Sequence, residues 1–195
     1  MVSTSRSRVR ALAVVGMAGV VAAIGAVTYQ ASAAEVAPKA PAAFGPDARS
    51  VSIPGIPEAI KPPPGSKPIG AYIVTSGTQN YTCTADGAYN PSSTPEAQLV
   101  GTGGKIHHFA GPSWQSVTDK SLVTATPTVK VAVAGSIPQL LLTVTSHTGT
   151  TRGLLSRVQA IQRLNTSGGA APTTACTDGE TVAVPYKANY VLWAN

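Results

Sequence analysis

The sequence predicts an all-β protein with one folded domain, built as an antiparallel β-sandwich or a jelly-roll-like fold. Short runs of Val, Thr, Leu and Tyr recur along the chain, and Gly or Pro separates them at roughly regular intervals. The clearest run, residues 139–147, alternates apolar with polar residues as a half-buried strand does. No convincing crossover helix is present, as a parallel sheet would need. Together these features favour a sandwich or a jelly roll.

The N-terminal segment has the pattern of a secretory signal peptide. Three arginines precede an apolar run over residues 11–27, and the small residues Ala31-Ser32-Ala33 follow. A positive end, an apolar stretch and a small-x-small site in this order are typical of exported proteins. We therefore expect residues 1–33 to be removed and the protein to be secreted, extracellular or associated with the cell wall. A membrane would be involved only through this segment, if it stayed uncleaved.

The rest of the chain carries little charge. The whole sequence has 14 basic and 8 acidic residues, and three of the basic ones lie in the signal segment, which leaves a net charge of about +3. The remaining basic residues are scattered singly, without the cluster or the interleaved aromatic residues of a nucleic-acid surface. We therefore expect no nucleic acid among the partners.

Residues 34–68 form a segment rich in Pro and Ala, with nine prolines. Proline removes backbone donors and fixes an extended conformation, so regular ladders cannot form there. We expect residues 34–49 to be a spacer and residues 51–68 to be an extended arm. The isoleucines of this arm could hold it against the domain: Ile53, Ile56 and Ile60. The β-sandwich domain is expected to span residues 69–195.

The first half of the domain contains two runs, residues 71–76 and 79–84, that predict a hairpin around Gly77-Thr78. A short strand over residues 98–100 precedes the turn residues 101–104, and residues 104–114 gather two of the three histidines, one tryptophan and one phenylalanine. Residues 121–133 predict a strand pair, or one long strand with a break at its proline.

The second half continues the strand pattern after the clear strand at residues 139–147. Residues 154–164 fit both a helical stripe and a strand, and flanking glycines favour the strand. Residues 181–184 and 189–193 predict two short final strands around Pro185-Tyr186.

Cys83 and Cys176 are the two cysteines of the chain, and both lie after the signal segment. An even pair in a small exported domain predicts one disulfide bond. Free thiols or a metal-binding pair are the alternatives, and the absence of a Cys-x-x-Cys spacing disfavours both.

Four motifs in the domain resemble those of a family of secreted proteins known as domain of unknown function 3455. These motifs are residues 76–83, 107–114, 161–169 and 184–190. The resemblance implies a secreted protein, and it brings no activity or catalytic residue with it. Some fungal relatives are labelled malate dehydrogenase, but the nearest match to a dinucleotide-binding Gly-x-Gly-x-x-Gly motif has Ile106 at the third glycine.

The histidines are the main candidates for chemistry. His107 and His108 are adjacent, so on one strand they point to opposite faces. His108 shares its face with apolar neighbours and is expected to be a buried, hydrogen-bonded polar group of the core. His107 and His147, with Asp119, are candidates for a metal ion or for acid–base chemistry. No cofactor other than this candidate metal ion is indicated.

Other residues give weaker signals. Five carboxylates of the domain could serve a glycosidase, although most lie in polar loops: Asp86, Glu96, Asp119, Asp178 and Glu180. Four aromatic residues could stack on a sugar or a flat ligand, or could fill the core: Tyr89, Trp114, Tyr186 and Trp193. No Gly-x-Ser-x-Gly motif for a serine hydrolase is present.

The sequence therefore predicts a secreted, disulfide-linked β protein that acts without catalysis, as a binding protein for a glycan, a cell-wall component or a small ligand. The alternative is a metal-assisted extracellular enzyme that uses the region of His107 and His147.

Overall fold

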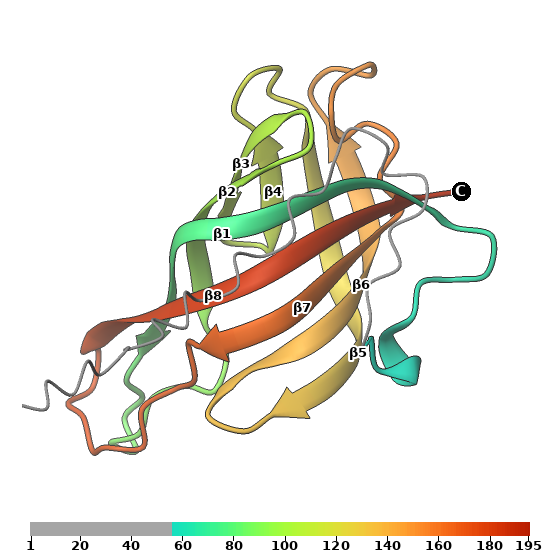
Figure 1. Cartoon of the computed structure of the whole chain (residues 1–195). Coiled ribbons are helices and arrows are strands. Elements are labelled where there is room, and N and C mark those ends of the chain that lie inside the picture. Colours follow the sequence, from blue (N-terminus) through green and yellow to red (C-terminus); the bar gives the residue numbers. More distant parts are fainter. Residues whose placement is uncertain (1–55) are drawn as a thin grey trace, which may run out of the picture. The chain divides into compact units, whose positions relative to one another are not determined.

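The computed structural model describes residues 56–195, so the predicted signal peptide and most of the Pro-rich segment lie outside the described residues. The described residues form a closed barrel of eight antiparallel strands (Figure 1). Each strand pairs with the next one along the chain, and β8 pairs with β1. The strands are β1 (Lys67–Thr82), β2 (Thr94–Gly101), β3 (Gly104–Phe109), β4 (Ser113–Ser116), β5 (Leu122–Val133), β6 (Ser136–Thr148), β7 (Ala160–Gly168) and β8 (Thr181–Ala194).

The all-β prediction is confirmed, whereas the sandwich or jelly roll is corrected to a barrel. The first strand pairs with the last one from Lys67 opposite Ala194 to Thr82 opposite Thr181, with two shifts of register between these ends. This pairing removes the free edges that an open sheet would leave. Strands of a sandwich and of a barrel alternate inward and outward residues in the same way. The alternation therefore did not distinguish the two folds.

The predicted hairpin at residues 71–84 is wrong, because these residues belong to the single strand β1. A Cβ atom on Gly77 would lie only 2.8 Å from the Ala97 Cβ and 2.9 Å from the Tyr186 ring. This glycine allows close packing against neighbouring side chains at an irregular stretch of the strand, and it makes no turn. The two predicted final strands are likewise one strand, β8, which continues through Pro185.

The turn at residues 101–104 and the strands at residues 121–133 and 139–147 are confirmed, and the strand at residues 154–164 is confirmed in part. Gly101 pairs with Gly104, so the predicted turn joins β2 to β3 as a tight hairpin. Residues 121–133 and 139–147 correspond to β5 and β6, with a shift of register after Pro127. The strand predicted over residues 154–164 begins only at Ala160.

The connections between strands alternate between the two ends of the barrel. At one end, which we call the plugged end, the β6–β7 connection places Leu155 and Val158 in the core, each with no exposed surface. The backbone N–H of Leu154 donates to Asp119 Oδ2 at 2.7 Å, and that of Leu155 donates to Ser121 Oγ at 3.1 Å. These bonds hold the connection to the β4–β5 turn. The opposite end, which we call the open end, carries residues 83–93, 110–112, 134–135 and 169–180.

The arm before β1 packs on the outside of the barrel. A short 3-10 helix, η2 (Glu58–Ile60), places Ile60 in a second apolar cluster with Trp193, and Ile56 packs against the same cluster. The Gln162 amide donates to the Ile60 carbonyl at 2.5 Å. The expected contact through Ile56 and Ile60 is therefore present, and Ile53 lies outside the described residues. Within residues 56–195 no helix is long and apolar enough to cross a bilayer.

Candidate functional site

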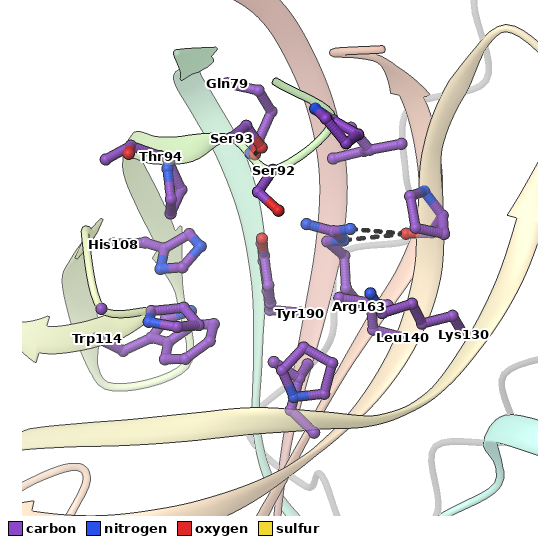
Figure 2. Close-up of a pocket in the computed structure, with 18 of the residues that line it drawn as sticks. Gln79, Ser92, Ser93, Thr94, His108, Trp114, Lys130, Leu140, Arg163 and Tyr190 are labelled. Carbon is purple, nitrogen blue, oxygen red and sulfur yellow. Dashed lines mark hydrogen bonds between the residues drawn. The ribbon is translucent and has the colours of Figure 1, made fainter. Parts of the chain in front are cut away.

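The barrel interior contains a cavity of about 370 Å³ toward the open end (Figure 2). Its walls combine apolar side chains with a few polar ones, and this composition and volume are typical of small-molecule sites. Inward positions of the strands supply the walls: His108, Trp114, Leu140, Leu142, Arg163 and Tyr190. Loops and turns of the open end supply the rim, including Pro91, Ser92, Ser93, Gly111 and Pro112.

His108 forms part of the cavity wall because the alternation along β3 turns it inward together with Ile106. Its Nδ1 lies 2.8 Å from the Ser113 carbonyl oxygen, and a carbonyl can only accept, so Nδ1 carries the proton. The pKa of His108 is lowered to about 3, chiefly because the ring is buried; the Ser113 hydrogen bond opposes this shift, and the positive charge of Arg163 adds to it. At neutral pH the imidazole is therefore uncharged, and Nε2 is a hydrogen-bond acceptor.

Arg163 on β7 is the charged group of the interior, with 9% of its surface exposed. Its Nε and Nη2 donate to the Pro138 carbonyl at 3.1 and 2.9 Å. Figure 2 shows the Arg163 guanidinium in the cavity, with these two hydrogen bonds drawn as dashed lines. Within residues 56–195, no carboxylate lies within 4.0 Å of the guanidinium, and the ion pairs found there involve Glu58 and Glu96 elsewhere.

Two tyrosines add hydroxyl groups to the polar part of the interior. The hydroxyls of Tyr186 and Tyr190 lie 3.3 Å apart, and Tyr190 lines the cavity. Burial raises the pKa of both hydroxyls, although the charge of Arg163 acts in the opposite direction. Both tyrosines therefore stay protonated at physiological pH and can donate a hydrogen bond.

The residues predicted for a metal or acid–base site have separate partners. His107 Nε2 lies 2.6 Å from Glu96 Oε1 on the outside of the barrel, and His147 Nε2 lies 2.8 Å from the Val158 carbonyl. The two histidines belong to β3 and β6, with two strands between them. The described part of the chain contains no group of three or more His, Cys, Asp or Glu placed to hold a metal ion.

Asp119 lies at the plugged end, away from the cavity. It accepts hydrogen bonds from the Ser121 hydroxyl at 2.6 Å and from the backbone of Ser121 and Leu154. These bonds, the one from the Ser121 side chain first, lower the pKa of Asp119 to about 2. Its contacts fix the connection that fills this end of the barrel.

The four aromatic candidates do not form one surface. Trp114 lines the cavity and Tyr186 lies in the same core, whereas Trp193 belongs to the outer cluster around Ile60. Tyr89 is half-buried in the β1–β2 connection and donates to Glu180 Oε1 at 2.9 Å. The predicted carboxylates are also outside the cavity, since none of the five lines it.

Arg163 is a site residue that the sequence analysis did not predict. It stands in the run Ala160-Ile161-Gln162-Arg163-Leu164, which is buried on both faces of β7, so alternation does not separate inward from outward positions. An arginine within such a run is itself the signal, because Arg is rarely buried unless it has a partner.

The Cys83–Cys176 disulfide lies at the open end, where it joins the end of β1 to the β7–β8 connection across 93 positions of sequence. The predicted disulfide is confirmed. The Cys176 N–H also donates to the Gly87 carbonyl at 3.1 Å, so both connections form one linked surface beside the cavity opening.

Comparison with known proteins gives a family and no relative of known activity. Residues 97–194 match the model of a family described as protein of unknown function (DUF3455). No curated protein and no solved structure matches the chain.

Proposed function

The chain belongs to the DUF3455 family of proteins of unknown function, and we propose that it is a secreted, non-catalytic protein that binds a small apolar molecule inside its barrel. The cavity behind the open end carries this proposal. Eight-stranded barrels of this kind have an interior just large enough for side chains or for one small ligand. Here side chains leave about 370 Å³ unfilled, and Trp114, Leu140 and Leu142 give that space an apolar wall.

The two ends of the barrel differ in a way that suits a binding protein. Leu155 and Val158 fill the plugged end, so a ligand would have to enter through the open end. At the open end the rim contains Ser92, which is exposed, and the turn at Gly111. A cavity of this size that is closed at one end favours a small molecule over a polymer such as a cell-wall glycan.

The protonation states in the cavity support binding without catalysis. General acid–base catalysis needs a group with a pKa near the working pH. The low pKa of His108 keeps it neutral, and the raised pKa of Tyr190 keeps its hydroxyl protonated. His108 also holds its proton in a hydrogen bond to the Ser113 carbonyl.

The disulfide supports the secreted location. Disulfide bonds persist in oxidising compartments and are rare in the cytosol of mesophiles. The bond between Cys83 and Cys176, together with the predicted signal peptide, is consistent with a protein that acts outside the cell.

Quenching of tryptophan by a brominated ligand tests the proposal, because bromine quenches an indole at contact distance. The chain has two tryptophans, so Trp193→Phe leaves only Trp114, in the cavity, and Trp114→Phe leaves only Trp193, on the outer cluster. A neutral, apolar probe, bromonaphthalene methanol, should quench the Trp193→Phe variant in a saturable way and the Trp114→Phe variant much less. Equal quenching of the two variants, or no saturable quenching, would overturn the proposal.

A further inference from the structure

We propose that Arg163 makes the cavity selective for small organic acids, whose carboxylate binds the guanidinium while an apolar body lies against Trp114 and Leu140. This inference rests on the proposed function, because it names the chemical class of the ligand that the cavity takes. It follows from the charge, the orientation and the surroundings of Arg163.

Arg163 places a positively charged guanidinium inside the barrel. Removing a charged group from water is energetically unfavourable unless a counter-charge or hydrogen bonds compensate it. Arg163 is 9% exposed, and its hydrogen bonds to Pro138 end on one neutral carbonyl. A ligand carboxylate would supply the missing negative charge at this position.

The guanidinium of Arg163 is held in one orientation. Two bonds from Nε and Nη2 to the same carbonyl fix the plane of the guanidinium and leave Nη1 as the end that projects away from Pro138. The planar guanidinium matches the geometry of a carboxylate, and little entropy is lost when it is already held. Arg163 and Tyr190 occupy paired positions on β7 and β8, so their side chains lie next to each other on the inner face of the barrel. The Tyr190 hydroxyl can then donate to the same carboxylate.

The residues that line the cavity around Arg163 suit a ligand with one negative charge and an apolar body. No Asp or Glu lines the cavity within residues 56–195. Lys130 at the rim is exposed, so solvent screens its charge, and Arg163 is the cation buried in the wall. One buried guanidinium balances a single negative charge, which favours a monocarboxylate over a doubly charged phosphate. Opposite the guanidinium, the flat pair of His108 and Trp114 offers a face on which an aromatic or alkyl body can lie.

The test compares two probes that differ in one group, bromonaphthoic acid and bromonaphthalene methanol, on the Trp193→Phe variant at neutral pH. The acid should bind at least about tenfold more tightly than the alcohol, as expected when a carboxylate gains charge-assisted hydrogen bonds. Adding Arg163→Gln should remove this preference and leave the affinity for the alcohol within about threefold. Lys130→Gln is the matched control, because it removes an exposed cation from the rim of the same cavity, and the preference should persist.

The outcomes separate the two proposals. If neither probe binds, the proposed function fails. If the alcohol binds as tightly as the acid, the cavity binds ligands but the role of Arg163 is wrong. An equal loss of preference in Lys130→Gln would assign the selectivity to the general positive charge and also overturn this inference. Should Arg163→Gln not fold, the ratio of acid to alcohol affinity in the parent protein and in Lys130→Gln still decides the question, because a ratio near one in the parent, or one lost in Lys130→Gln, overturns the inference.

Discussion

The imidazole of His108 lies flat against the indole of Trp114, with ring centroids 4.2 Å apart and planes 8° from parallel. The two residues are paired across β3 and β4, so the sheet itself sets this stack. The Tyr190 ring meets both of them edge-on, with centroids at 5.5 and 6.0 Å. Side chains of β3 and β4 are thereby in contact with a side chain of β8 inside the barrel, beside the cavity.

Replacement of His108 by Ala should destabilise the protein much more than replacement of His107. The His108 change removes a buried ring and leaves the Ser113 carbonyl without its donor, and an unpaired buried group alone costs about 1–3 kcal/mol. His107 pairs with Glu96 at the surface, where such pairs are worth about 0–1 kcal/mol. Urea unfolding of the two variants measures the difference. Equal losses would contradict the placement of His108 in the core.

The stability of the protein should fall as the pH is lowered from about 7.5 to about 5, and His108 should cause much of this fall. An unfolded His titrates near pH 6.5, whereas the pKa of folded His108 is lowered to about 3. Between these values the unfolded state binds more protons, so the free energy of unfolding rises with pH and falls as the pH drops. One such group contributes about 2 kcal/mol over this range.

The control for this prediction is His108→Phe, which keeps a flat ring against Trp114 and removes the titrating group. Urea unfolding at several pH values should show a smaller dependence on pH in this variant. The lowered pKa of Asp119, about 2, acts only at lower pH, since its stabilising effect is lost as the pH falls below about 4. Above pH 5 the difference in slope between the two proteins therefore reports on His108 and not on Asp119. The same slope in both proteins would refute the assignment.

Asp119 should stabilise the plugged end even though it is exposed. Asp119→Ala removes the acceptor for the backbone N–H of Leu154 and for Ser121, and hydrogen bonds to charged groups contribute about 1.5–3 kcal/mol in favourable cases. Hydrogen exchange should show faster opening of residues 149–159, with little change in β1 and β8. Asp178→Ala, in an exposed loop of the open end, is the matched control. If both variants exchange alike, Asp119 does not hold the plug.

Sequence patterns predicted the class of fold because they depend on local chemistry. The tight turn at Gly101 to Gly104 and the long alternation of β6 are set by neighbouring residues, and both are present. Closure of the barrel depends instead on pairing between β1 and β8, which lie about a hundred residues apart. Nothing in the alternation of either strand specifies its partner. The closed barrel was therefore beyond what the pattern could show.

The candidate site was predicted only in part for a related reason. Trp114 was named as a ligand-binding candidate and lines the cavity, and His108 was placed on the inward face of its strand. Arg163 was missed because β7 is covered on both sides, by the barrel core and by the outer cluster around Ile60. His107 and His147 were grouped because they are chemically alike, although strand order places two strands between them.

Loss of the Cys83–Cys176 disulfide should lower the melting temperature strongly. The bond spans 93 positions, and the chain-entropy model assigns a loop of this length about 4–5 kcal/mol as an upper value. This is comparable to the total stability of a small domain. Cys83→Ser/Cys176→Ser should keep the β-type circular dichroism of whatever remains folded. Intact mass after blocking of free thiols checks the bond, and two blocked thiols in exported protein would contradict it.

The arm before β1 should contribute to stability mainly through Ile60, the residue of the arm that is fully buried. The sequence suggested that the domain could start at residue 69, and a cut there would remove Ile60 together with the first residues of β1. Ile60 has no exposed surface, and its carbonyl accepts from Gln162, whose Oε1 in turn accepts from Trp193 Nε1 at 2.9 Å. Ile60→Ala should therefore cost about 2–5 kcal/mol, the range for truncation of a buried isoleucine. Ile73→Ala is the matched control, since Ile73 is 37% exposed and should cost far less.

Tryptophan fluorescence gives this last prediction a local measurement besides urea unfolding. In the Trp114→Phe background the remaining indole, Trp193, reports on the outer cluster, and Ile60→Ala should shift its emission to longer wavelength as water reaches the ring. The same Ile60 change in the Trp193→Phe background should leave the Trp114 emission nearly unchanged, because that indole lies inside the barrel with 1% of its surface exposed. Equal shifts in the two backgrounds would mean that the arm supports the whole barrel. Equal stability of Ile60→Ala and Ile73→Ala would mean that the arm contributes nothing, and that the domain does begin near residue 69.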